Sequence, residues 1–427
     1  MRGYSWPGLW LGIALVAASG AAPARAEGGR TVILAVFDGF APALVDAFDT
    51  PALDRMRREG AWTHRMEPAF PTISLINGVT ISTGCWPEHH GIVTNLFWDP
   101  ERGVYDHDSD ADWLAGCEHL HQAAERQGVR SAALAWYGSH SGLRGPLATY
   151  VEERGRLCGD GLVPPLDPPR AEELVRLLNL PAAERPRLLL AYFCGPDAAE
   201  HFRGMDSEET RQAVAQSDAI LGTLLEAIEA LPYRDRVTLL VTTDHGMTPV
   251  TTLVNVQRIL GKLGIAARFH STGTTSFLYF DDPAAVEPAA KALAEYEEFE
   301  VLRENALPPY AHLGNGARAG DLILSARPPY FIEDVGRWPS WLRWLGDWGP
   351  ETMWARFSLK ASHGYPPDTP GMAGILYAWG DGIAKGREVE RVRAIDVHPT
   401  VAHLLGIEAG RPVDGEVARG LLAEEAP

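Results

Sequence analysis

Six acidic and histidine side chains stand at the ends of apolar, strand-like segments of the chain, or just before one. They are Asp38, Asp197, His201, Asp244, His245 and His363. In open α/β sheets ligands bind at the carboxyl ends of the strands, so these side chains are predicted to converge on one site. The four-residue spacing of Asp197 and His201 places both on one face of a helical turn. Carboxylates mixed with imidazoles suit zinc better than iron or manganese, and two zinc ions about 3.5–4 Å apart would use this many ligands.

A hydroxyl nucleophile for such a site is available in the segment 70–74, just before a predicted helix. Thr72 and Ser74 are both candidates, because the positive end of a helix favours a deprotonated oxygen and the anion that it attacks. Coordination to zinc would lower the pKa of the hydroxyl further. Either hydroxyl could instead be a helix N-cap, and spacing does not choose between the two.

The elements that must position these residues alternate between buried strands and helices. Strands are predicted over 30–37, 131–136, 187–193, 237–243 and 373–378, and helices over 50–60, 73–83, 171–178, 207–231 and 396–405, the last capped by Asp396. This alternation predicts an α/β fold around a mostly parallel sheet. Residues 251–360, rich in Pro, Gly and Trp, break the alternation. They are predicted to form an inserted cap subdomain on a catalytic domain made of 27–250 and 361–427.

The charge balance narrows the classes of function. The 427 residues include 38 Lys and Arg against 56 Asp and Glu, a formal net charge of −18. A chain without a basic excess does not release counterions from nucleic acid, so no nucleic-acid binding is expected. An anionic small-molecule substrate stays compatible with this charge, because a bound metal inverts the local field. The sequence does not determine the oligomeric state.

Residues 1–26 have the pattern of a secretory signal peptide. Arg2 precedes an apolar stretch over 9–18, and a small-x-small cleavage signal follows at 24–26. The apolar stretch is shorter than the about 20 residues that span a bilayer. We therefore expect a secreted or periplasmic protein with no transmembrane segment in the mature chain.

Four cysteines, Cys85, Cys117, Cys158 and Cys194, remain after the predicted cleavage. An oxidising compartment permits disulfides, and four cysteines allow three full pairings. Turn-rich polar surroundings favour Cys117–Cys158. The apolar strand around Cys194 predicts a buried free thiol there.

Several motifs, taken together, resemble those of the alkaline phosphatase superfamily, and within it the nucleotide pyrophosphatase/phosphodiesterase (type I phosphodiesterase) family. They are Asp38, the stretch PTIS at 71–74, the stretch TGCWPEHHGIVTN at 83–95, Asp197 with His201, Asp244-His245-Gly246 and His363-Gly364. The motifs extend over nearly the whole mature chain. The resemblance implies an alkaline phosphatase-like three-layer sandwich, with helices on both faces of a mostly parallel central sheet.

The resemblance also implies ligands and roles. One zinc ion would be held by Asp197, His201 and His363, and the other by Asp38, Asp244, His245 and the Ser74 oxygen. In an ungapped comparison the nucleophilic threonine of the family falls on Ser74, and Asn95 would donate to a non-bridging phosphoryl oxygen. The implied reaction is hydrolysis of phosphate diesters or pyrophosphates through a phosphoseryl intermediate.

This chain departs from the family at the residue after the nucleophile. Leu75 stands where nucleotide-cleaving members have a phenylalanine, so one aromatic face for a nucleobase is missing. The alternatives are a phosphomonoesterase or phosphonate hydrolase on the same scaffold, or a non-catalytic metal-dependent binding protein. The pair Ser74 and Asn95 argues against a mere binding protein, because neither residue is needed to hold zinc.

The segment 338–354 is unusually rich in tryptophan. It contains Trp338, Trp341, Trp344, Trp348 and Trp354. The spacing of the first four predicts an amphipathic helix that packs the insert. The alternative is an aromatic surface that grips an apolar or sugar-like leaving group or touches a membrane.

Overall fold

A computed structural model describes residues 29–106, 109–139, 143–152, 166–314, 316–335, 338–355 and 359–424. The predicted signal peptide, residues 1–26, lies outside the described residues. Within the described ranges, no helix combines the length and the apolar character needed to cross a membrane.

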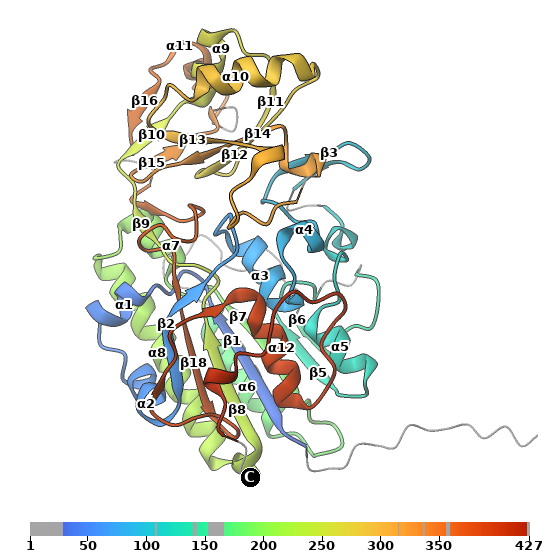
Figure 1. The fold of residues 1–427 in the computed structure, drawn as a ribbon. Helices are drawn as coiled ribbons and strands as arrows, with labels where there is room; N and C mark the ends of the chain where they lie inside the picture. Colours follow the sequence, from blue (N-terminus) through green and yellow to red (C-terminus); the bar gives the residue numbers. More distant parts are fainter. Residues whose placement is uncertain are drawn as a thin grey trace, which may run out of the picture.

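A nine-stranded sheet forms the centre of the larger body (Figure 1). Its order is β19-β2-β18-β8-β1-β7-β5-β6, and β20 pairs with β2. The strands are β1 (Thr31–Phe37), β2 (Ala61–Glu67), β5 (Ser131–Leu134), β6 (Tyr150–Glu152), β7 (Leu188–Phe193), β8 (Val237–Thr242), β18 (Gly374–Gly380), β19 (Arg387–Glu388) and β20 (Val392–Arg393). The strands from β8 to β6 are mutually parallel, whereas β18 runs antiparallel to both of its neighbours. The predicted mostly parallel sheet is therefore confirmed.

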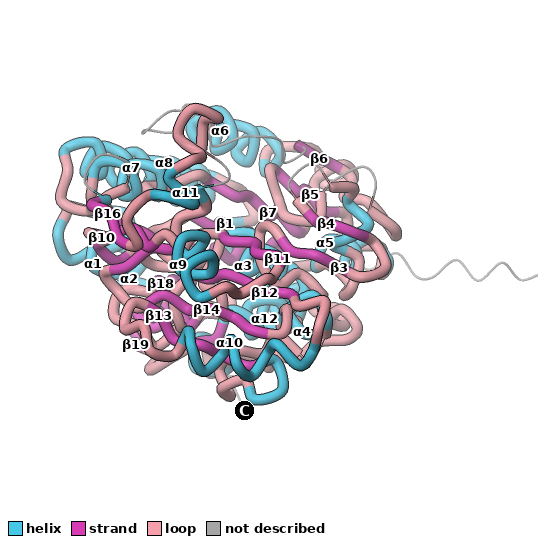
Figure 2. Tube along the Cα trace, turned by 90° about the horizontal axis from the view of Figure 1, so that it is seen from above, coloured by secondary structure: helices cyan, strands magenta, loops and turns pink. Residues whose placement is uncertain are grey.

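Helices cover both faces of this sheet. On one face lie α2 (Pro51–Glu59), α6 (Asp167–Leu178) and α8 (Glu208–Ala230), and on the other lie α3 (Ser74–Thr83), α5 (Leu120–Arg126) and α12 (Ala394–Leu405). Figure 2 shows α6 and α8 on one side of β1 and β7, with α3 and α12 on the other. Side chains of β1 point alternately into a hydrophobic core on each face of the sheet. Phe37 packs in the same core as Leu221 of α8, and Leu34 packs in the same core as Ile76 of α3. The three-layer sandwich is confirmed.

Several predicted element ends are corrected by the structure. The helix predicted over 171–178 begins at Asp167. The C-terminal helix begins at Ala394, not 396, with Arg393 at the N-cap position; Asp396 is the third helical residue and accepts a hydrogen bond from the Arg393 N–H at 3.1 Å. The strand predicted over 131–136 ends at Leu134, because Ala135 has a φ of 51° and leaves the extended region.

Short elements connect these layers. They are α1 (Pro42–Ala47), α4 (Pro87–His90), α7 (Asp197–Arg203) and the hairpin of β3 (Phe97–Asp99) and β4 (Gly103–Tyr105). Of these, α7 begins soon after β7 ends, so its first turn lies at the carboxyl edge of the sheet.

A smaller body stands above that edge. Its first sheet contains β10 (Thr252–Val254), β15 (Tyr330–Ile332) and β16 (Thr352–Trp354), and its second contains β11 (Arg268–Ser271), β12 (Thr275–Tyr279), β13 (Phe299–Arg303) and β14 (Leu322–Ala326). The helices α9 (Val256–Leu263), α10 (Val286–Leu293) and α11 (Leu345–Trp348) lie at its far end (Figure 1). The chain leaves through β9 (Thr248–Pro249) and returns through β17 (Ala361–Ser362), and these two strands pair with each other. We therefore propose residues 251–360 as the inserted cap.

The tryptophan-rich segment does not form the predicted amphipathic helix. Only the four residues of α11 are α-helical, and the hydrogen bonds before it join residues three apart, as between the Leu342 N–H and the Pro339 carbonyl at 2.8 Å. Such tight turns do not continue the 3.6-residue face that the tryptophan spacing would need. The predicted packing is also wrong for Trp341, Trp344 and Trp348, which are 71%, 56% and 78% exposed. Trp354, outside the predicted helix, is 78% exposed.

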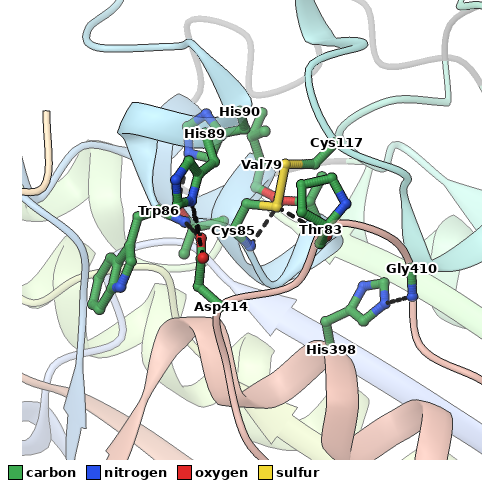
Figure 3. Close-up of a disulfide and its surroundings, with 12 residues drawn as sticks. Val79, Thr83, Cys85, Trp86, His89, His90, Cys117, His398, Gly410 and Asp414 are labelled. Atoms are coloured by element: carbon green, nitrogen blue, oxygen red, sulfur yellow. Dashed lines mark hydrogen bonds and ion pairs between the residues drawn. A yellow bond between two sulfur atoms is a disulfide. The ribbon is translucent and has the colours of Figure 1, made fainter. Parts of the chain in front are cut away.

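The disulfide pairing differs from the prediction. Cys85 is bonded to Cys117, so the pairing of Cys117 with Cys158 is wrong (Figure 3). The left-handed Gly84 ends α3 and turns Cys85 toward the loop that precedes α5. Cys194 is disulfide-bonded as well and is not the predicted free thiol. Cys158 lies outside the described residues.

One close contact lets α3 approach the sheet, and it can be tested. A Cβ at Gly78 would come within 1.9 Å of the Tyr137 ring. Gly78→Ala is therefore expected to lower the free energy of unfolding by about 1–3 kcal/mol in urea denaturation, through overpacking. The matched control is Gly222→Ala on α8, where nothing lies within 4 Å of the new Cβ; a gain of up to about 1 kcal/mol is expected there. Equal stability of the two variants would contradict this account of α3 packing.

Candidate metal centre and nucleophile

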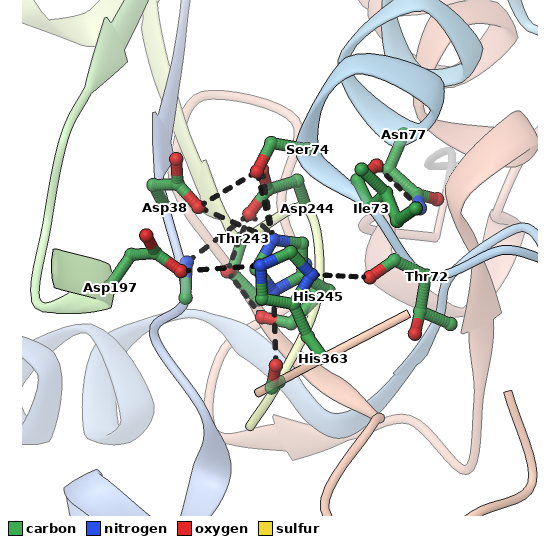
Figure 4. Close-up of polar contacts among 12 residues, drawn as sticks. Asp38, Thr72, Ile73, Ser74, Asn77, Asp197, Thr243, Asp244, His245 and His363 are labelled. Atoms are coloured by element: carbon green, nitrogen blue, oxygen red, sulfur yellow. Dashed lines mark hydrogen bonds and ion pairs between the residues drawn. The ribbon is translucent and has the colours of Figure 1, made fainter. Parts of the chain in front are cut away.

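The acidic and histidine side chains singled out from the sequence come from the carboxyl ends of three adjacent parallel strands and from the returning segment after β17. Asp38 follows β1, Asp197 begins α7 after β7, and Asp244 and His245 follow β8, as Figure 4 shows. His363 follows β17. Two sets have ligand atoms that all lie within 4.8 Å of one another: Asp197, His201 and His363, and Asp38, Asp197 and His245. The fold therefore brings these residues to one place.

The first set is arranged around the Asp197 carboxylate. Its Oδ1 lies 3.3 Å from Nε2 of His201 and 3.6 Å from Nε2 of His363. The four-residue spacing on α7 places Asp197 and His201 on the same face, as the sequence predicts.

The second set is arranged around His245, whose side chain is fully buried. Its Nε2 lies 3.4 Å from Oδ1 of Asp38 and 3.0 Å from Oγ of Ser74. The Ser74 hydroxyl also donates to Oδ1 of Asp38 at 3.3 Å. The imidazole rings of His245 and His363 stack with centroids 3.5 Å apart, so the two sets adjoin.

All three histidines turn the same ring nitrogen toward the site. Nδ1 of His201 donates to the Ala361 carbonyl at 2.8 Å, and Nδ1 of His363 donates to the Thr72 carbonyl at 2.9 Å. Nδ1 of His245 lies 3.0 Å from the Gly246 carbonyl. A carbonyl can only accept, so each Nδ1 carries a proton, and in the neutral ring Nε2 is the nitrogen with the lone pair. Histidine ligands of metal ions have this arrangement.

Asp244 is held by protein donors on both oxygens. Oδ2 accepts from the Tyr192 hydroxyl at 2.8 Å, and Oδ1 accepts from the Gly39 N–H at 3.2 Å and the His245 N–H at 3.1 Å. These bonds fix the carboxylate beside His245, with its Oδ2 3.7 Å from Nε2. The sequence reasoning did not predict Tyr192 as a site residue. The signal that could have indicated it is its position one residue before the end of β7.

The buried carboxylate of Asp197 carries a negative charge that a bound cation would compensate. Oδ1 of Asp197 is buried and accepts no hydrogen bond among the described residues. Burial raises the pKa of Asp197, but the nearby His201 and His363 outweigh it and hold that pKa below its usual value. Burial and the neighbouring His245 hold the pKa of His363 well below its usual value, so this ring is neutral at physiological pH. An ionised carboxylate with no donor, beside the neutral His363 ring, fits a divalent metal, and the O and N donors suit zinc.

Glu200 is a second buried acid that the sequence reasoning did not single out. It lies on α7 between the two ligand candidates of that helix, and neither of its oxygens has a hydrogen-bond partner among the described residues. Burial and the charge of Asp197 raise the pKa of Glu200 well above its usual value. A neutral carboxylic acid is therefore expected at this position, and it adds no negative charge to the site.

Glycine allows the strand ends to meet closely. Gly195, between β7 and α7, has a φ of +53°, and a Cβ there would lie 2.5 Å from the Asp38 carbonyl oxygen. Neither the backbone conformation nor the space admits a larger residue. This contact keeps the segments that carry Asp38 and Asp197 side by side.

The two hydroxyl candidates occupy different surroundings. Thr72 is fully buried; its hydroxyl donates to the Tyr365 carbonyl at 2.9 Å and accepts from the Gly364 N–H at 2.8 Å. Ser74 is the first residue of α3, makes no capping bond there, and faces Asp38 and His245. The geometry favours Ser74 as the nucleophile, because the Thr72 hydroxyl is engaged with the backbone.

Asn95 lies on a loop that the cap helps to hold. Its Oδ1 is buried and has no hydrogen-bond partner among the described residues. The neighbouring Thr94 hydroxyl contacts the Thr272 hydroxyl at 2.8 Å, and Thr274 in the same turn donates to the His363 carbonyl at 2.8 Å. One turn of the cap thus supports both the Asn95 loop and a candidate metal ligand. No spacing in the sequence indicates this support.

Comparisons with known proteins agree with this geometry. The family model described as type I phosphodiesterase / nucleotide pyrophosphatase matches residues 32–365. An uncharacterised pyrophosphatase/phosphodiesterase of Schizosaccharomyces pombe is 27% identical over 396 residues, which cover 89% of this chain and 77% of that protein. Human ectonucleotide pyrophosphatase/phosphodiesterase family member 7 is 26% identical over 439 residues, covering 95% of this chain and 87% of that protein. The structure of murine ectonucleotide pyrophosphatase/phosphodiesterase 5 has a TM-score of 0.79 at 21% identity and covers 92% of this chain and 100% of that chain.

Metal content tests the ligand assignment directly. After dialysis against zinc, the chain is expected to hold about two zinc ions, as in two-metal sites, and His363→Ala about one fewer, because a ligand is removed from one set. The measurement is elemental analysis of the dialysed protein. The matched control is His403→Ala, which changes an exposed histidine of α12 and is expected to keep the full content. The same zinc content in both variants would remove His363 from the centre.

Proposed function

Because the chain belongs to the type I phosphodiesterase / nucleotide pyrophosphatase family, whose members are phosphodiester hydrolases, we propose that it hydrolyses phosphate diesters or pyrophosphates at a two-zinc centre through a phosphoseryl intermediate. The family match confirms the resemblance inferred from the motifs. One observation carries the proposal: Oγ of Ser74 lies 3.0 Å from Nε2 of His245 and 3.3 Å from Oδ1 of Asp38. A hydroxyl at the start of a helix thus directly faces two candidate metal ligands.

Two groups of residues would hold the metal. One zinc ion would be held by Asp197, His201 and His363, and the other by Asp38, Asp244, His245 and the Ser74 oxygen. When bound, the two ions would supply Lewis acidity that lowers the pKa of the serine hydroxyl and compensates charge on the phosphoryl and leaving oxygens. The lone pairs at Nε2 of the three histidines and the unpartnered Oδ1 of Asp197 support this assignment.

The chemical steps assigned to the chain itself begin at Ser74. Its Oγ loses its proton to solvent and attacks phosphorus, a new oxygen–phosphorus bond forms, and the bond to the leaving ester oxygen breaks with its electron pair. The leaving oxygen takes a proton from water as needed. The N-terminus of α3, where Ser74 stands, favours the negative charge that gathers in the transition state. Water then cleaves the phosphoserine and restores the hydroxyl. The Asn95 amide N–H is proposed to donate to a non-bridging oxygen, where the charge grows during both steps.

Leu75, the residue after the proposed nucleophile, affects which leaving groups the site can bind. Leu75 is buried, with 6% of its surface exposed, and presents no aromatic face for a nucleobase. We therefore propose phosphate esters whose leaving group needs no base stacking at this position. A comparison of a nucleoside aryl ester with a bis-aryl phosphate at equal concentration tests this preference.

A secreted or periplasmic location is part of the proposal. The Cys85–Cys117 disulfide supports it, because structural disulfides persist in oxidising compartments. The sequence pattern of residues 1–26 points the same way. N-terminal sequencing of the protein exported from an expressing cell would show whether the chain begins at Glu27.

The nucleophile is tested by a pair of variants. Ser74→Ala is expected to lower kcat on a bis-aryl phosphate diester by about a thousandfold or more while zinc stays bound, because the covalent step is lost. Thr72→Ser keeps a hydroxyl that can bond to the Tyr365 carbonyl, and it is expected to retain most of the activity. Full activity of Ser74→Ala would exclude Ser74 and leave Thr72 as the remaining hydroxyl candidate. Faster turnover of the matched aryl monoester by the unchanged protein would assign it to the phosphatase alternative.

The role of Asn95 is tested by Asn95→Ala. Loss of a donor to the transition-state oxygen is expected to lower kcat by about a hundredfold or more, with a smaller change in KM. Zinc content measured on the same sample serves as the control and is expected to be unchanged, because Asn95 is not a proposed ligand. A variant with full kcat would exclude this donor from the mechanism.

A further inference from the structure

Four tryptophans of the cap are exposed without a covering element among the described residues. Trp341, Trp344, Trp348 and Trp354, here called the tryptophan face, are 56–78% exposed. The other large exposed hydrophobic side chains are between 37% and 53% exposed, and none of them is a tryptophan. Exposing so much indole surface to water is unfavourable, and such patches mark interaction sites.

The tryptophan face belongs to the segment that leads into the metal centre. Trp341 and Trp344 precede α11, and Trp348 is the last residue of this helix, which lies at the far end of the cap (Figure 1). Trp354 ends β16 at the edge of its sheet. Beyond it, the Lys360 N–H donates to the His201 carbonyl at 2.7 Å, and His363 follows three residues later. Phe202, the neighbour of His201, is itself 53% exposed. Exposed aromatic surface therefore lies at both ends of the path from the cap to the site.

The charges around the tryptophan face are balanced rather than basic. Lys262 pairs with Glu351 at 2.7 Å. Arg258 donates to the Asp347 carbonyl at 2.8 Å, and Arg343 donates to the Trp338 carbonyl at 2.8 Å. These cations are engaged within the cap and do not form a basic patch. The whole chain has a net charge of −18, so an anionic surface would repel it.

A hollow beside Trp354 adds a preference for positive charge. It has a volume of about 400 Å³, and Trp354, Tyr330 and Glu298 are among its lining residues. Aromatic rings beside a carboxylate attract a quaternary ammonium group through cation–π and charge interactions. An occupant that matches both the exposed indoles and this hollow has an apolar part and a cationic end group.

We propose that the tryptophan face docks on the surface of a bilayer of zwitterionic phospholipid whose headgroups end in a quaternary ammonium. Indole side chains are favoured at the membrane–water interface, because the ring is apolar and its N–H needs a polar partner. The balanced charge of the cap and the acidic hollow fit such a surface and disfavour an anionic one. Docking needs no turnover, so this inference stands apart from the catalytic proposal.

Sedimentation with vesicles tests the docking. The full chain carrying Ser74→Ala, mixed with phosphatidylcholine vesicles, is expected to sediment with them and to show a blue shift of its tryptophan fluorescence. Adding Trp341→Ala, Trp344→Ala, Trp348→Ala and Trp354→Ala is expected to weaken vesicle binding at least tenfold. The control set is Leu147→Ala with Val151→Ala, which removes exposed apolar side chains of the catalytic body and is expected to leave binding unchanged.

Three results would overturn the docking proposal. The first is equal vesicle binding by the tryptophan variant and the control variant, both shown to be folded by thermal unfolding. The second is binding to vesicles of phosphatidylglycerol but not to vesicles of phosphatidylcholine, which would indicate an anionic partner. The third is a dimer in light scattering that the tryptophan variant loses, without vesicle binding by the parent, which would assign the face to a second copy of the chain.

Discussion

The burial of several carboxylates at one edge of the sheet is the constraint on which the rest of this structure depends. Asp38 and Asp197 follow neighbouring parallel strands, and Gly195 lets their backbones meet at a distance that no side chain would allow. Gathering such groups away from water is unfavourable unless cations compensate the charge. The site turns the Nε2 atoms of three imidazoles inward and groups its ligand atoms closely enough to hold divalent metal, which would supply the compensating positive charge.

The backbone decides where those imidazoles point. Each ring donates its Nδ1 proton to a carbonyl, and the three carbonyls belong to Ala361, Thr72 and Gly246, in three different segments. The Thr72 hydroxyl and the turn at Thr274 in turn hold the segment that carries His363. The catalytic body and the cap therefore share the support of one candidate ligand, and a shift of the cap would move that ligand.

The position of Ser74 and the exposed tryptophans of the cap both depend on how α3 and the cap lie at the edge of the sheet. Ser74 faces the centre because α3 begins beside it, and α3 lies close to the sheet because Gly78 leaves space for the Tyr137 ring. On the far side, the segment that ends at His363 carries exposed indoles along the cap. A phosphodiester hydrolase built this way has its proposed reactive hydroxyl at the sheet edge and exposed indoles among charges of both signs on the element above it.

The amino-acid sequence by itself indicated the sheet, most of the helices and the candidate metal ligands, because continuous apolar runs and the Asp and His residues at their ends are local patterns. Residue types and spacing left open the choice between Thr72 and Ser74, and only the family resemblance pointed to Ser74. The surroundings that distinguish the two hydroxyls include the distant Tyr365 carbonyl and Gly364 N–H. The cysteine pairing and the burial of the tryptophans were also predicted wrongly. Cys85 meets Cys117 where Gly84 ends α3, and Trp341 is exposed where tight turns replace the expected helix. Tertiary structure decided the cysteine pairing and the exposure of the tryptophans and favours Ser74 over Thr72, because each depends on contacts between segments far apart in the chain or on a backbone turn that side-chain periodicity does not encode.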